Sequence, residues 1–102
     1  MFVVCNRIPV KPEHAEAFEE RFADRAQMVD GMEGFVSFNL LRPKDQDDPY
    51  IVMTFWETEA HFVAWTTSDA FKEGHARSGT LPPDTFLGHP KIETFDVIQS
   101  TT

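Results

Sequence analysis

The sequence predicts an α+β fold in which one antiparallel β-sheet carries helices on one of its faces. Three observations support this class. The elements follow the order strand, helix, strand, strand, helix, strand; a short polar turn joins the two middle strands; and the first helix has one apolar stripe. This order is the split βαβ pattern of ferredoxin-like folds. We expect residues 1–102 to form a single domain, because a chain of this length supports one core of two layers.

The first strand is expected to begin at Phe2 and to give way to the next helix at residues 9–12, which contain two prolines. Phe2, Val4 and Ile8 share one face of this strand with Asn6, because side chains alternate with a period of two. An amide therefore interrupts an apolar row that should face the core. Burying an amide without a partner costs about 1–3 kcal/mol, so Asn6 is expected to bond to protein, water or a ligand.

A helix is expected over about residues 13–30. Gly31 and Gly34 then end it and turn the chain. The apolar stripe of this helix, which should pack on the core, consists of Ala15, Phe18, Phe22, Ala26 and Val29. Four glutamates form its charged face, and we interpret them as solvated. These are Glu13, Glu16, Glu19 and Glu20.

The next two strands, residues 35–42 and 50–56, are rich in aromatic and β-branched residues. The polar turn between them predicts an antiparallel hairpin. The second strand is apolar on both faces, since Val52 and Trp56 oppose Phe55. A sheet that is apolar on both sides needs a second cover. Two such sheets packing face to face in a homodimer would supply it.

The last helical region is expected to break into two helices. Thr58 can cap the first, but its helical period would place Phe71 on the side opposite to the other aromatic residues. A break after Trp65 allows Ser68 to cap a second helix, in which Phe71 and His75 share a face because they are four residues apart. The segment 78–90 contains three prolines and two glycines and predicts a loop. A final strand is expected over about residues 92–98.

Charge and cysteine content exclude several classes of function. A net charge of −8 repels phosphate backbones, and no basic run is present, so we expect no nucleic-acid partner. Cys5 is the only cysteine, so neither an intrachain disulfide nor a cysteine-rich metal site can form. The opening residues are typical of neither a signal peptide nor a membrane span, which favours a cytoplasmic location with no membrane partner.

Asn6, Trp65 and His75 together suggest a haem pocket. An imidazole can ligate haem iron, an indole can fill space against a planar ligand, and an amide can donate a hydrogen bond inside the pocket. Each residue also has an ordinary alternative: a structural amide for Asn6, core packing for Trp65, and a solvated position near a helix C-terminus for His75. His14, His61 and His89 are interpreted as surface residues without a metal role. Because haem is anionic, cations are needed locally, and the candidates are Arg7, Arg21, Arg25 and Arg77.

The chain resembles the antibiotic biosynthesis monooxygenase superfamily of dimeric α+β barrels, and most resembles its IsdG-type haem-degrading members. The resemblance covers nearly the whole chain. Its most specific part is the run Trp-x-x-Ser-x-x-Phe-x-x-x-His from Trp65 to His75, combined with Asn6. The other matching stretches are Asn6-Arg7, Glu33-Gly34-Phe35 and residues 52–56.

The resemblance implies roles for individual residues. His75 matches the axial haem ligand, Trp65 matches the tryptophan that presses on and ruffles the porphyrin, and Asn6 matches the amide on the distal side where oxygen is activated. Arg21 and Arg25 match helix positions near the propionates, and Phe22 and Phe71 are assigned to the pocket wall. The chain departs from the pattern at Cys5, where an acid is common, and at Thr66-Thr67, where a more apolar residue is common.

Two alternatives to haem degradation stay open from the sequence. A cofactor-independent monooxygenase of the same superfamily would oxidise an aromatic polyketide or quinol in the same cavity, using the carbanion of the substrate itself to react with oxygen. Asn6 and Trp65 would then serve as binding groups. A non-catalytic dimer that binds a small aromatic molecule is the second alternative.

Overall fold

A computed structural model describes residues 1–78 and 85–101, except for the side chains of residues 24–28 and 74–78. The part of the predicted 78–90 loop that covers residues 79–84 lies outside this description, as does residue 102. The described strands are β1 (Phe2–Ile8), β2 (Phe35–Leu41), β3 (Tyr50–Trp56) and β4 (Lys91–Asp96). The described helices are a 3₁₀ turn (Pro12–His14), α1 (Ala15–Val29), α2 (Glu59–Thr66) and α3 (Asp69–Ser78).

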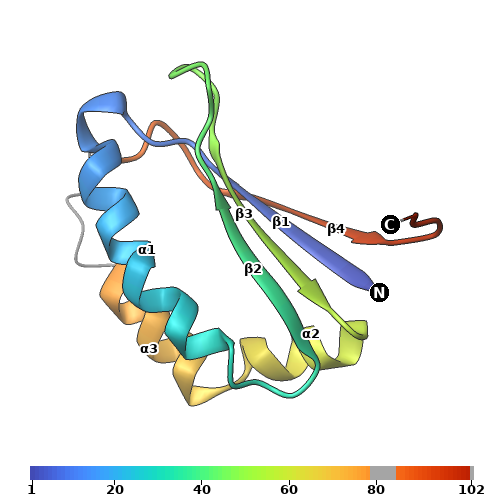
Figure 1. The fold of residues 1–102 in the computed structure, drawn as a ribbon. Coiled ribbons are helices and arrows are strands. Elements are labelled where there is room, and N and C mark those ends of the chain that lie inside the picture. Colours follow the sequence, from blue (N-terminus) through green and yellow to red (C-terminus); the bar gives the residue numbers. More distant parts are fainter. Residues whose placement is uncertain (79–84, 102) are drawn as a thin grey trace.

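The four strands form one antiparallel sheet in the order β2-β3-β1-β4. The three described α-helices lie on the same side of this sheet, and none of them lies on the opposite face (Figure 1). The predicted α+β, ferredoxin-like fold is therefore confirmed. Within the chain the sheet remains open, with β2 and β4 at its edges.

The end of β1 agrees with the sequence prediction, whereas the end of β4 differs from it. β1 ends at Ile8 because Pro9 has no N–H with which to continue the ladder, and Val10 forms only an isolated bridge with Phe86. β4 ends at Asp96. Beyond it, Val97 still donates a hydrogen bond to the Met1 carbonyl at 2.9 Å, but the side chain of Ile98 is exposed.

The register places one face of each central strand toward the helices. Phe2 pairs with Trp56, Val4 with Thr54 and Asn6 with Val52, so these residues share the covered face. The core on this face consists of two clusters. The first contains Phe2, Val4, Val29, Trp56 and Trp65, and the second contains Ile8, Val10, Phe18, Phe22 and Tyr50.

The break between the last two helices is confirmed, as are both predicted caps. The Thr58 hydroxyl accepts from the His61 N–H at 3.3 Å and caps α2. The Ser68 hydroxyl accepts from the Phe71 N–H at 3.1 Å and donates to the Trp65 carbonyl at 2.7 Å. Ser68 therefore joins the end of α2 to the start of α3.

Gly34 is a position where only glycine fits. Its φ of +78° lies in the left-handed region, and a Cβ there would come within 2.1 Å of the His61 ring. His61, interpreted as a surface residue from sequence, is instead half-buried against this turn, while its Nδ1 lies 2.8 Å from the Thr58 hydroxyl. The contact fixes the start of α2 against the entry to β2.

Candidate functional site

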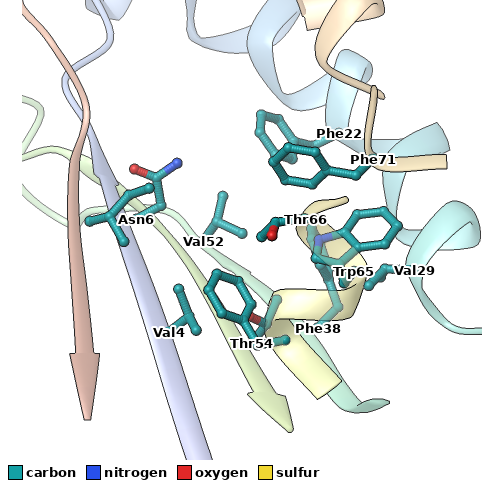
Figure 2. A pocket seen from close by; sticks show the side chains of 12 residues that line it. Val4, Asn6, Phe22, Val29, Phe38, Val52, Thr54, Trp65, Thr66 and Phe71 are labelled. Carbon is teal, nitrogen blue, oxygen red and sulfur yellow. The ribbon is translucent and has the colours of Figure 1, made fainter. Parts of the chain in front are cut away.

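A cavity of about 120 Å³ lies between the covered face of the sheet and the helices. Aromatic and aliphatic side chains make up most of its wall, and a few polar groups interrupt them (Figure 2). Its lining residues are Val4, Asn6, Phe22, Val29, Phe38, Val52, Thr54, Phe62, Trp65, Thr66, Phe71 and Ile92. Asn6 and Trp65, predicted to border one cavity, do so.

Asn6 reaches the cavity because β1 is a central strand. It pairs with Val52 of β3 on one side and with Ile92 of β4 on the other. Its amide lies across the cavity from Phe22 and Phe71 (Figure 2). The buried Oδ1 has no hydrogen-bond partner among the described residues, so the amide retains bonding capacity for a ligand or a water molecule.

Trp65 forms the α2 side of the wall. Its indole is 7% exposed and packs edge-on against Phe71, with ring centroids 5.4 Å apart. On another side it stacks on Trp56, with centroids 6.4 Å apart and ring planes inclined by 29°. The Trp65 indole is thus fixed between two aromatic neighbours.

His75 lies in α3, four residues after Phe71, but its side chain is outside the described part of the structure. The same applies to the side chains of Arg25 in α1 and Arg77 in α3. Phe71, which starts the predicted pair on α3, lines the cavity. The roles assigned to His75, Arg25 and Arg77 remain predictions.

Arg7, predicted as one of the cations near the haem pocket, does not lie at the cavity. Its position next to Asn6 puts it on the opposite sheet face, where it forms an ion pair with Glu93 of β4. The hydrogen bond from Arg7 lowers the pKa of the Glu93 carboxyl. Arg21 is exposed on α1, and among the described side chains no lysine or arginine lines the cavity.

Glu19 is not simply a solvated member of the charged helix face. Its carboxylate accepts hydrogen bonds from the Arg42 guanidinium, with Nε at 2.9 Å from Oε2, and from the Tyr50 hydroxyl. These bonds, the one from Arg42 first, lower its pKa to about 2. Burial and the bond to Glu19 raise the pKa of Tyr50. Glu13, Glu16 and Glu20 are exposed, as expected.

The described lining fits the chemistry of a flat, mostly apolar ring system. Large aromatic side chains provide apolar surface, and the Asn6 amide provides an unpaired polar group. The volume is below the roughly 300–1,000 Å³ typical of small-molecule sites. No cluster of three or more metal-ligating side chains occurs among the described residues.

No described helix is both long enough and apolar enough to cross a membrane. A family model for antibiotic biosynthesis monooxygenases matches residues 1–77. The chain belongs to the antibiotic biosynthesis monooxygenase (ABM) family.

Similar proteins support this membership. The chain is 45% identical over 78 residues to a heme oxygenase (staphylobilin-producing) of Staphylococcus haemolyticus, covering 74% of this chain and 73% of the relative. The structure of the heme-degrader MhuD from Mycobacterium tuberculosis, with two haems in its active site, has a TM-score of 0.79 and 31% identity over the full length of both chains. SnoaB, a cofactor-independent oxygenase from Streptomyces nogalater studied as a mutant, has a TM-score of 0.77 and 25% identity over 97% of this chain and 94% of that one.

Proposed function

We propose that this chain is a haem-degrading monooxygenase, which cleaves haem oxidatively and releases its iron. The observation that carries the proposal is the cavity in which an incompletely bonded amide, Asn6, shares one space with the indole of Trp65 and the ring of Phe71. Similarity to relatives and solved structures that degrade haem favours haem as the ligand. Haem, when bound, supplies both the carbon skeleton to be oxidised and the iron at which oxygen is activated.

We propose a role for each of the predicted site residues. His75 would hold the haem iron through its imidazole, and Asn6 would donate a hydrogen bond inside the pocket. Trp65 would pack against a bound ring, and Phe22 and Phe71 would exclude water from the apolar wall. Arg21 and Arg25 of α1 are assigned to the propionates, because an anionic ligand in a chain of net charge −8 needs local cations.

We also propose that the protein works as a cytoplasmic homodimer. The two copies would meet through the sheet face opposite the helices, because this face is apolar. Met53 and Phe55 are half-buried on it, and Phe95 is 50% exposed there. This face has no other cover in the described structure (Figure 1). A lone cysteine is compatible with a reducing compartment.

A cofactor-independent oxygenase is the second candidate function. Similarity to SnoaB favours it, as does the absence of any described basic side chain at the cavity, because a neutral aromatic substrate needs no counter-charge. Asn6 and Trp65 would then bind the substrate rather than surround a haem.

A haemin titration distinguishes the two functions. We expect one haemin per chain and a sharp Soret band for the unmodified protein. His75→Ala should lose that band and the turnover with ascorbate, whereas His89→Ala, which changes an exposed histidine near β4, should keep both. If the unmodified protein binds no haemin, haem is not its substrate and the cofactor-independent function is the better one. If it binds and degrades haemin but His75→Ala changes neither spectrum nor turnover, His75 is not the residue that holds the haem iron.

A further inference from the structure

Trp56 lies behind the cavity wall rather than in it. Its side chain is completely buried, with 0% exposure, and it is the largest fully buried side chain of the described core. Trp56 does not line the cavity, but it stacks on Trp65, which does. The two tryptophans thus form two layers, with Trp65 in contact with the cavity and Trp56 supporting it.

A single hydrogen bond fixes the orientation of Trp56. Its Nε1–H donates to the hydroxyl of Thr54 at 3.1 Å, two residues earlier on β3. An indole nitrogen only donates, and the bond is fully buried, so rotating the ring would leave that N–H without an acceptor. Phe35 and Phe62 pack edge-on against the same ring, with centroids 5.7 and 6.0 Å away, and restrict it further.

Thr54 connects this layer to the cavity. It is 9% exposed and lines the cavity, on the covered face where β3 pairs with Val4 of β1. Thr54 therefore lines the cavity and, through its hydroxyl, also holds Trp56 behind the cavity wall. Any displacement of Trp56 moves the surface against which Trp65 packs.

We propose that Thr54 and Trp56 are positioning residues that set how far Trp65 projects into the cavity. The proposal rests on the haem-degrading function, because a tryptophan can distort a planar ring only if the side chains behind that tryptophan keep it in place. Thr54 supplies the hydrogen bond, Trp56 supplies the support, and Trp65 makes the contact.

The first test needs no ligand. The chain has two tryptophans, so an ¹⁵N-labelled sample gives two indole N–H cross-peaks, which Trp65→Phe assigns. We expect Thr54→Val to shift both peaks and Thr54→Ser, which keeps the hydroxyl, to restore them. Thr94→Val is the matched control, because Thr94 is exposed on β4 and flanks Val4 from the other side. A Thr54→Val protein in which only the Trp56 peak moves would overturn the proposal.

Trp56→Phe provides a second variant in case the loss of the Thr54 hydroxyl prevents folding. It keeps an aromatic ring but removes the hydrogen bond and part of the support. The remaining indole peak, that of Trp65, should shift or broaden. An unchanged Trp65 peak in this variant would also contradict the proposal.

The second test uses the haem-loaded protein. We expect Trp56→Phe to reduce turnover at saturating haem by at least about tenfold, because displacing a catalytic group by about 1 Å can cost about 100-fold in rate. The haem affinity of this variant should change less than its turnover. Equal losses of affinity and turnover would indicate a merely structural role and overturn the proposal. If the unmodified protein binds no haem, the proposed function fails, while the indole spectra still decide whether Trp56 positions Trp65.

Discussion

At the scale of single residues, Asn6 couples a cost in stability to a gain in function. Its buried Oδ1 lacks a protein partner, and such a group costs about 1–3 kcal/mol. We therefore expect Asn6→Leu, which has a similar volume and no polar atom, to raise the free energy of unfolding by about 1 kcal/mol in urea titrations. The same change also removes the Asn6 Nδ2–H donor, so it should slow haem turnover by about 100-fold or more, by analogy with the loss of one preorganised donor.

Asn39 is the matched control for this substitution. Its amide Nδ2 donates to the Met53 carbonyl at 3.3 Å and lies 3.4 Å from the Ser37 hydroxyl. The side chain of Asn39 thus has a hydrogen-bond partner, whereas Asn6 Oδ1 has none among the described residues. Asn39→Leu should lower the free energy of unfolding by about 1 kcal/mol. If Asn6→Leu destabilises the protein as much as Asn39→Leu does, a bound water already satisfies Asn6 and its polar group is not reserved for a ligand.

At the scale of secondary structure elements, Ser68 links the end of α2 to the start of α3. One hydroxyl bonds both the Trp65 carbonyl and the Phe71 N–H, so it fixes the backbone of two aromatic residues that touch in the cavity wall. Ser68→Ala should lower the free energy of unfolding by about 1 kcal/mol, the usual cost of losing an N-cap. Thr67→Ala is the control, because Thr67 donates only to the Ala64 carbonyl and is exposed; an equal loss in both variants would contradict this role for Ser68.

Glu19 ties α1 to β3 and to the end of β2, and this tie should depend on pH. Hydrogen bonds from Arg42 and Tyr50 hold the pKa of Glu19 near 2 in the folded protein, below its ordinary value of 4.5. A lowered folded-state pKa stabilises the fold above the ordinary pKa, and that contribution disappears as the pH falls from about 4.5 to about 2. Glu19→Gln should therefore reduce stability at pH 7 and flatten its decline below pH 4.5, as measured by urea unfolding across pH. Glu16→Gln, at an exposed position of the same helix, should change neither.

These elements also show what a sequence can and cannot predict. The break after Trp65 was predictable because Phe71 falls out of the helical period, and Asn6 was predictable because strand alternation fixes its face. The pairing of Glu19 with Arg42 was missed, since the two residues are 23 positions apart and only the packing of α1 on the hairpin brings them together. Arg7 was misplaced for the opposite reason: the alternation that sends Asn6 to the cavity sends its neighbour to the other face.

At the scale of the whole molecule, the uncovered sheet face makes the proposed dimer testable. Val3 pairs with Phe55 and Phe95 across the three adjacent strands, which gives this face a continuous apolar row. Specific interfaces commonly bury about 1,200–2,000 Å² in total, and two sheets packed face to face should reach that range. We expect sedimentation at micromolar concentration to give twice the chain mass of 11.7 kDa.

A charge placed in the apolar row should separate the two copies. Phe55→Asp would bury a carboxylate between the sheets without a partner, which strongly opposes association, so this variant should sediment as a folded monomer with an unchanged far-ultraviolet spectrum. Val63→Asp is the matched control, because Val63 is 52% exposed on α2, on the helical side of the molecule, and its substitution should leave the dimer intact. If the unmodified protein sediments as a monomer, or if Val63→Asp dissociates it while Phe55→Asp does not, the sheet face is not the contact surface between copies.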